Sequence, residues 1–294
     1  MRMPQLVTDP GTRQTDRYEI VAPQQKESFV DSTRINGTGS LPSPPGYVGR
    51  DDDDLFRQTL NQARLSTVAL VSANAPIWRS SAPYEDFSHG GYSWNNDIWG
   101  GRGAGPQTIS VYADNRWSVW SNQPNTGGIK SYPHQAFNVG KPLSSIKTLT
   151  GSFNQDVPSG GAWDTAYDIW DSSHQNEIML WTNHTGNPDG SGNVKPISSQ
   201  YDTSGAAIPV YRNVNVGGAN WNVFVGSNGQ RVISLVRTSK TDSGTVDIKG
   251  VLDWLKSKGY FGDINVGSVQ YGVEITGSAG GANFNFKNCS VTST

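Results

Sequence analysis

Two glutamates in the sequence lie in strand-like runs, where acidic side chains are uncommon. In residues 176–181, strand alternation places Glu177 on the same face as Met179 and Trp181. In residues 267–276, apolar side chains alternate with polar ones, and Glu274 lies on the polar face. Two carboxyl groups on the polar faces of separate strands are the minimum equipment for hydrolysis of a glycosidic bond. The alternative is a pair of rim glutamates on a half-solvated sheet, since sequence spacing does not show that they meet.

Residues that could bind a metal or form a disulfide are few. Cys289 is the only cysteine, which excludes an intrachain disulfide and a cysteine-based metal site. His134, His174 and His184 have no ligand spacing and are interpreted as loop residues. Four aspartates at 51–54 precede a helix-like run, where they complement the helix dipole, whereas cation-binding loops space their ligands apart. We therefore expect no metal and no cofactor.

The two glutamates need a scaffold of short strands. From about residue 84, short alternating runs separated by glycine, asparagine and proline predict an all-β sandwich or barrel. The expected strands cover residues 108–112, 117–120, 147–153, 162–170, 177–182, 213–216, 221–225, 231–238, 268–276 and 283–291. Residues 227–229 predict a hairpin turn. One helix is expected over residues 248–255, with Asp247 as its N-cap and Gly259 as its stop.

The N-terminal part has a different composition. Residues 1–50 are polar and rich in proline, with no helix or strand periodicity, so alone they cannot offset their ordering entropy. Residues 55–63 predict a short helix with Phe56, Leu60 and Ala63 on one stripe, and residues 67–71 predict a short strand. We divide the chain into an arm, residues 1–84, and a β domain, residues 85–294. We expect the arm to contact protein partners in an assembly.

Composition limits the functions open to this chain. Its 294 residues include 34 glycines and 16 prolines, and a mean hydropathy of -0.53 with 16% charged residues is typical of a turn-rich β protein. The net charge of -2 provides no footprint for nucleic acid or an anionic membrane. The first ten residues lack the apolar region of a Sec-type signal, and no apolar run is long enough for a membrane span. We expect extracellular action, either after removal of a signal or within a virion or surface assembly.

Five motifs in order resemble glycoside hydrolase family 12, which comprises endo-β-1,4-glucanases and xyloglucan hydrolases. They are Asn95-Asn96-Asp97-Ile98-Trp99-Gly100, Lys130-Ser131-Tyr132-Pro133, Ala166-Tyr167-Asp168-Ile169-Trp170, Asn176-Glu177-Ile178-Met179-Leu180-Trp181 and Gln270-Tyr271-Gly272-Val273-Glu274. The similarity covers roughly residues 90–294. It implies a β-jelly roll of two antiparallel sheets, an open cleft for a glucan chain on the concave sheet, and hydrolysis with retained configuration.

The resemblance also implies roles for individual residues. Glu177 matches the nucleophile, Glu274 the acid/base, and Asp168 an aspartate near the nucleophile, although an aspartate in this position could also cap a turn. Trp99 matches a tryptophan that stacks on a glucose ring. Core packing is the alternative for Trp99 and Trp181. The other residues expected to contact the polysaccharide are Asn96, Tyr132, His134, Met179 and Trp181.

The sequence departs from the family pattern in several places. Val273 replaces the usual threonine before the acid/base, and His134 stands where asparagine is common. The segment between Asp168 and Glu177 is short, and the N-terminal disulfide of secreted members cannot form. Because both glutamates are present, these departures bear more on substrate preference than on catalysis. The alternative function is a structural or adhesive component of a larger assembly, such as a phage tail, that binds or trims surface glycans.

Overall fold

The computed structural model describes residues 55–64, 75–186 and 194–294. Residues 55–64 form a helix, as expected from the sequence. The chain divides into two units, Met1–Leu55 and Phe56–Thr294. The aspartates at 51–54, the polar segment 1–50 and the strand expected over 67–71 lie outside the described residues. No helix in the described ranges is long and apolar enough to cross a membrane.

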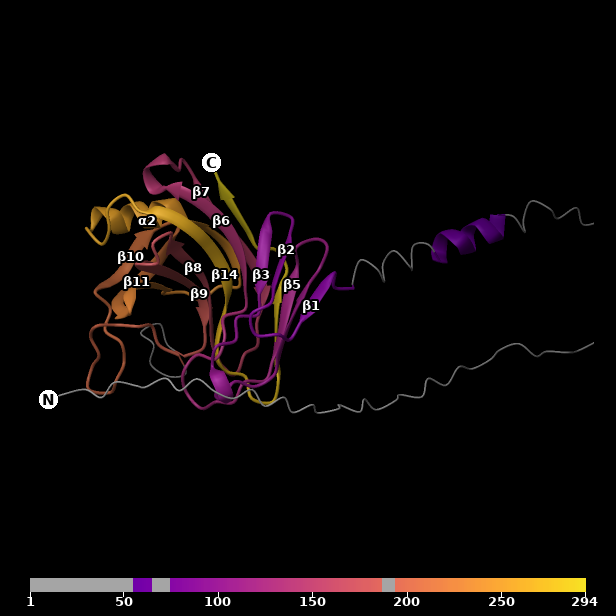
Figure 1. Cartoon of the computed structure of the whole chain (residues 1–294), viewed down its shortest axis with the longest axis horizontal. Helices are drawn as coiled ribbons and strands as arrows, with labels where there is room; N and C mark the ends of the chain where they lie inside the picture. Colours follow the sequence, from indigo (N-terminus) through magenta and orange to yellow (C-terminus); the bar gives the residue numbers. More distant parts are fainter. Residues whose placement is uncertain (1–54, 65–74, 187–193) are drawn as a thin grey trace, which may run out of the picture. The chain divides into compact units, whose positions relative to one another are not determined.

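Two β-sheets, which together form a β-jelly roll, make up most of the rest of the described chain (Figure 1). In the seven-stranded sheet the order is β1 (Trp78–Ser80), β4 (Gln107–Val111), β5 (Trp117–Ser121), β15 (Ala282–Phe286), β7 (Leu149–Asp156) and β13 (Ser243–Asp247), with β16 (Ser290–Ser293) also paired to β7. Since β1 pairs with β4, this sheet begins before residue 85.

The nine-stranded sheet carries the residues of interest. Its order is β10 (Tyr211–Val216), β11 (Ala219–Asn228), β12 (Gln230–Arg237), β9 (Asn176–His184), β8 (Ala162–Asp171), β14 (Asn265–Gly277), β6 (His134–Pro142), β3 (Tyr92–Asn95) and β2 (Asp86–His89). Neighbouring strands are antiparallel except β9 and β12, which are parallel. The nine-stranded sheet is therefore not wholly antiparallel: after β9 the chain forms β10 and β11, and the hairpin from β11 places β12 parallel to β9.

The main core lies between the sheets and contains one face of each central strand. On β9, Ile178 and Leu180 are fully buried in it, and on β14 the alternate residues from Val269 to Ile275 are at most 2% exposed. Strand alternation consequently turns Glu177 and Glu274 to the opposite face of the sheet. A second apolar cluster lies on that opposite face, where Met179 and Trp181 pack with Val194 and Ala207.

Helix α2 (Ile248–Ser257) packs its buried residues into the main core and contacts β7 and β10 (Figure 1). The Asp247 side chain accepts a hydrogen bond from Gly250 N, and Gly259 has a positive φ of 79° just after the helix. Both predicted helix boundaries are thus confirmed. Two short 3-10 helices, η1 (Gly101–Gly103) and η2 (Leu143–Ser145), complete the elements.

Most predicted strands are confirmed, but five strands had no strong signal. Strands β1, β2, β3, β6 and β13 were not expected, and the strand expected over 283–291 is divided into β15 and β16. At the break, Lys287 N and Asn288 N both donate to Asn154 O, so the regular pairing with β7 is interrupted between β15 and β16. β6 contains Gly140 at positive φ and ends in proline, and both features weaken its own preference for a strand. Its pairing with β14 and β3 therefore stabilises it as a strand.

Candidate active site

Three adjacent strands bring three predicted residues into one cleft. Glu177 lies on β9, Asp168 on β8 and Glu274 on β14, and β8 is the middle strand. Asp168 is level with Met179 on one side and with Gln270 on the other. The cleft has a volume of about 470 Å³, and its wall also includes Trp99, Tyr132, Met179 and Trp181.

Glu177 is half-buried and held by a single side chain. Gln230 Nε2 donates a hydrogen bond to Glu177 Oε2 at 2.5 Å. Gln230 is the first residue of β12, directly after the predicted turn, where Gly229 has a positive φ of 86°. Burial raises the pKa of Glu177, while the hydrogen bond from Gln230 lowers it. This amide therefore favours the ionised form of the carboxyl group.

Glu274 keeps its proton up to about neutral pH. Burial raises its pKa, the charge of Glu177 raises it further, and the pKa reaches about 7 despite an opposing hydrogen bond from Asp164. The neighbouring Gly272 is required for backbone approach, because a Cβ there would lie 2.4 Å from Pro133 O. The room left by this glycine is therefore filled by the chain at Pro133.

Asp168 and Asp164 add two further carboxyl groups from β8. Asp168 is 6% exposed and Asp164 is 1% exposed. Trp170 Nε1 donates to Asp168 Oδ2 at 2.8 Å. Burial, followed by the charge of Glu177, raises the pKa of Asp168 well above its usual range. A buried group with one donor and two acidic neighbours is suited to carry a proton.

The aromatic residues of the cleft differ in exposure. Trp99 is 42% exposed, so its ring is available to stack on a sugar ring. Trp181 is 2% exposed and Met179 is 5% exposed, because residues after 194 pack over them. Tyr132 is also buried, and its hydroxyl donates to Ala166 O at 3.0 Å. Trp99 is thus the exposed aromatic wall, and the other three support the floor.

Two residues expected to contact the polysaccharide do not line the cleft. Asn96 is fully buried, where its Nδ2 donates to Ala82 O and its Oδ1 accepts from Gln107 Nε2. His134 is 8% exposed; its Nδ1 lies 2.7 Å from Tyr132 O, and its ring stacks on that of Tyr132. Asn96 holds the segment before Trp99, and His134 supports Tyr132.

Several cleft residues were not predicted from the sequence. They are Asp97, Trp170, His174, Lys195, Gln230 and Gln270. Asp97 has a positive φ of 40°, and burial with the charge of Asp86 raises its pKa to about 6. The only sequence signals were the position of Gln230 after a hairpin turn and the alternation that turns Gln270 to the same face as Glu274. Within the described ranges, no group of three or more His, Cys, Asp or Glu residues could hold a metal ion.

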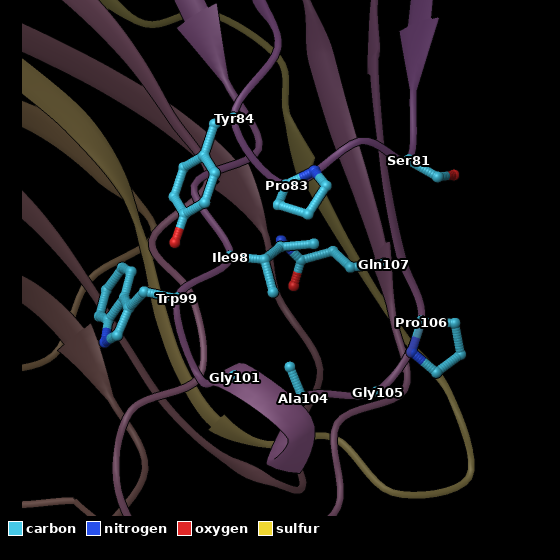
Figure 2. A pocket seen from close by; sticks show the side chains of 10 residues that line it. All are labelled: Ser81, Pro83, Tyr84, Ile98, Trp99, Gly101, Ala104, Gly105, Pro106 and Gln107. Atoms are coloured by element: carbon cyan, nitrogen blue, oxygen red, sulfur yellow. The ribbon is translucent and has the colours of Figure 1, made fainter. Parts of the chain in front are cut away.

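A second pocket adjoins the cleft at Trp99, which lines both. Its volume is about 530 Å³, and its wall comes from the segments 81–84, 98–101 and 104–107. Figure 2 shows the Tyr84 and Trp99 rings on one side of this pocket, with Pro83 and Ile98 between them and Gln107. Tyr84 is 62% exposed, so two exposed aromatic rings lie at this end of the cleft.

Comparison with known proteins identifies the family. The model of Glycosyl hydrolase family 12 matches residues 87–293. The chain belongs to this family. It is therefore a glycoside hydrolase with a polysaccharide substrate, from a family that retains anomeric configuration. The predicted resemblance, fold class and enzyme class are confirmed.

Relatives of this family 12 hydrolase include a close structural match. A solved structure of the xyloglucanase domain of NopAA, a type three effector from Sinorhizobium fredii, in complex with cellobiose, is 76% identical, has a TM-score of 0.73, and covers 74% of this chain and 100% of that chain. The Xyloglucan-specific endo-beta-1,4-glucanase A of Emericella nidulans is 29% identical over 74% of this chain and 92% of that protein. Endoglucanase S of Pectobacterium parmentieri is 28% identical over 66% of this chain and 79% of that protein.

Proposed function

We propose that this hydrolase cleaves the β-1,4-glucan backbone of xyloglucan by double displacement, with Glu177 as nucleophile and Glu274 as acid/base. The observation that carries the proposal is that the two carboxyl groups share one cleft, where burial, with a further contribution from the charge of Glu177, raises the pKa of Glu274 to about 7. Retaining glycosidases need such a pair, one carboxyl ionised and one protonated.

In the first step, Glu177 attacks the anomeric carbon while Glu274 protonates the leaving glycosidic oxygen. The C1–O bond of the substrate breaks, the new sugar chain end leaves as an alcohol, and a glycosyl ester forms on Glu177. Gln230 orients Glu177 for this attack through its hydrogen bond to Oε2. Asp168 lies between the two glutamates, and its proton limits the negative charge that builds up beside the ester.

In the second step, Glu274 acts as a base. Esterification removes the charge of Glu177, which is one of the causes that raise the pKa of Glu274. The Glu274 carboxylate then takes a proton from water as the water oxygen attacks C1 and releases Glu177. The sugar leaves with its original anomeric configuration, because each step inverts it once.

The choice of xyloglucan is supported by the relatives. The NopAA domain, 76% identical, is described as a xyloglucanase, and the Emericella nidulans relative as xyloglucan-specific. The exposed ring of Trp99 offers a stacking surface for the backbone. The remaining predicted contacts with the polysaccharide, Tyr132, Met179 and Trp181, act through the cleft floor, whereas Asn96 and His134 act indirectly.

The place of action is proposed to be outside the cell that produces the protein. The NopAA relative is described as a type three effector, and that match leaves about a quarter of this chain outside it. The family match begins at residue 87 and β1 already belongs to the β domain, so the residues before β1 are proposed to serve export or contact with protein partners. The alternative of a particle component gains no support from the relatives named above.

An activity panel tests this function. Purified protein is assayed for reducing ends released from xyloglucan, carboxymethylcellulose and mixed-linkage β-glucan, beside Glu177→Gln and Gln175→Glu as an exposed control on the same hairpin. Xyloglucan should be cleaved fastest, and only Glu177→Gln should abolish cleavage. Activity restricted to unbranched glucans would overturn the choice of substrate, and no cleavage of any glucan would overturn the function.

A further inference from the structure

The structure assigns to Asp164 a positioning role in which its neutral carboxyl group donates a hydrogen bond that supports Glu274 as the acid/base. This inference rests on the proposed function, because it takes Glu274 as the acid/base. Asp164 lies outside the five sequence motifs that point to the family, and it does not line the cleft. Its effect on the reaction would pass entirely through Glu274.

The two residues face each other directly across the sheet. Asp164 on β8 is the register partner of Glu274 on β14. Side chains opposite each other in an antiparallel pair lie on the same face, with Cβ atoms about 4.5–5.5 Å apart. The two carboxyl groups affect each other's pKa, as a side-chain hydrogen bond between them would, and the buried Asp164 Oδ1 has no other hydrogen-bond partner in the described part of the chain. Asp164 is 1% exposed, so water does not compete for this bond.

A hydrogen bond between two carboxyl groups requires a proton on one of them, because an ionised carboxylate only accepts. Burial raises the pKa of Asp164 well above its usual range, and the charges of Glu274 and Asp168 raise it further. The bond with Asp164 lowers the pKa of Glu274 instead. Asp164 is therefore the donor that keeps its proton, and Glu274 is the member that can release one.

No neighbouring cation provides an alternative partner for Asp164. Among the described residues, no lysine, arginine or histidine forms an ion pair with it. His184, level with Asp164 on β9, is kept neutral by burial, which lowers its pKa. The Lys130 ammonium group donates to the carbonyls of Gly127 and Gly128. The remaining titratable groups near Asp164 are Asp168 and the Tyr132 phenol.

The role of the bond appears in the first chemical step. When Glu274 gives its proton to the glycosidic oxygen, it becomes a carboxylate in a half-buried position of the cleft. The Asp164 hydroxyl donates to this new charge and stabilises it, while its own proton stays on Asp164. In the second step Glu274 recovers a proton from water, and the original bond is restored. Asp164 undergoes no net change.

The test compares a variant that keeps the donor with variants that remove it. The side-chain carboxyl carbon of Glu274 is titrated by NMR in the full chain for wild type, Asp164→Asn and Asp164→Ala, and the pH profile of kcat/KM is recorded for the same proteins. Asp164→Ala should raise the pKa of Glu274, move the basic limb of the profile upward and lower kcat/KM about tenfold to a hundredfold. Asp164→Asn, whose amide still donates, should stay close to wild type. Asp164→Leu, similar in shape to asparagine, replaces the alanine variant if that does not fold.

Two outcomes would overturn the inference. A fall in the pKa of Glu274 in Asp164→Asn would mean that Asp164 is an anion in the wild type. An unchanged Glu274 titration in the variants without a donor would mean that the bond does not act on Glu274. Because the titration needs no turnover, it decides the inference even if wild type cleaves no glucan, a result that would overturn the proposed function instead.

Discussion

The negative charge of Glu177 on β9 raises the pKa of Glu274 on β14, although β8 lies between the two strands. Burial is the larger cause, and the pKa of Glu274 reaches about 7. Because of this coupling, the pKa of Glu274 depends on whether Glu177 is a free carboxylate or an uncharged ester. This dependence is what a retaining mechanism requires, since one group must act first as acid and then as base.

The first prediction concerns the basic limb of the pH profile. Glu274 must be protonated in the free enzyme, so kcat/KM should fall as the pH rises through about 7. Replacement of Glu177 by Gln removes a negative neighbour and should lower the pKa of Glu274, which an NMR titration measures in the inactive protein. An unchanged or higher pKa in Glu177→Gln would show that the two carboxyl groups are not coupled.

The second prediction concerns Gln230. Replacement by alanine removes the only side-chain donor described for Glu177, so the pKa of Glu177 should rise and the acidic limb of kcat/KM should move upward. A charge-assisted hydrogen bond of this kind corresponds to a loss of about tenfold to a hundredfold in kcat/KM. Gln175→Ala is the control, because Gln175 is exposed on the hairpin before β9. Equal losses in both variants would argue against a specific role for Gln230.

The third prediction separates Trp99 from an equally exposed tryptophan. Trp99→Ala should raise KM for the polysaccharide about fivefold or more with a smaller change in kcat, since the stacking surface binds substrate remote from the reacting bond. Trp120 is 40% exposed against 42% for Trp99, but lies on β5 of the other sheet. Trp120→Ala should leave KM unchanged. Steady-state kinetics on xyloglucan would refute the assignment if the two variants behaved alike.

The fourth prediction concerns stability and pH. The pKa of Asp168 is raised in the folded protein, chiefly by burial. The protonated Asp168 therefore contributes to the free energy of unfolding at pH values below its pKa in the unfolded chain. This contribution is lost as the pH rises through its pKa in the folded protein. Asp168→Asn cannot ionise, so it does not lose this stability. The Tm of Asp168→Asn minus the Tm of wild type should therefore be larger at pH 7 than at pH 4. Asp202→Asn is the control of opposite sign, because hydrogen bonds from Ser204 and Ala206 lower the pKa of Asp202. Its Tm should fall at pH 7, and a Tm difference for Asp168→Asn that is constant with pH would contradict the argument.

The fifth prediction concerns the glycine beside Glu274. In Gly272→Ala the new Cβ would meet Pro133 O at 2.4 Å, so the backbone has to shift and the free energy of unfolding should fall by about 2 kcal/mol or more. Gly262→Ala is the matched control, because no atom lies within 4 Å of the added Cβ. Urea unfolding measures both, and an equal effect at the two positions would mean that the contact with Pro133 relaxes freely.

The faces of the central strands could be predicted because alternation is a local property. The polar faces of β9 and β14 follow from residues within each strand, and so does the cap of α2 by Asp247. The strand β6 could not be predicted in this way. Its residues have weak strand preference, and its place depends on β3 and β14, which are distant in sequence.

The candidate site was predictable only where a side chain belongs to a motif. The role of Gln230 was not predicted, because its contact with Glu177 depends on the parallel pairing of β12 and β9, which no local pattern contains. Trp181 lines the cleft, but its burial under residues from Val194 onward is a long-range packing effect that no local pattern contains. The role proposed for Asp164 was not predicted, because it depends on Glu274, the residue opposite it on β14, rather than on the pattern of its own strand.

The most direct test of the account is to trap the covalent intermediate. A 2-deoxy-2-fluoro cellobioside with a good leaving group slows both steps and allows the glycosyl ester to accumulate, and mass spectrometry of the digested protein then locates the label. The account predicts one added disaccharide per chain, attached to the peptide that contains Glu177, and none in Glu177→Gln. A label on Asp168 or Glu274, or a substrate that is turned over to a product of inverted configuration without any label, would contradict it.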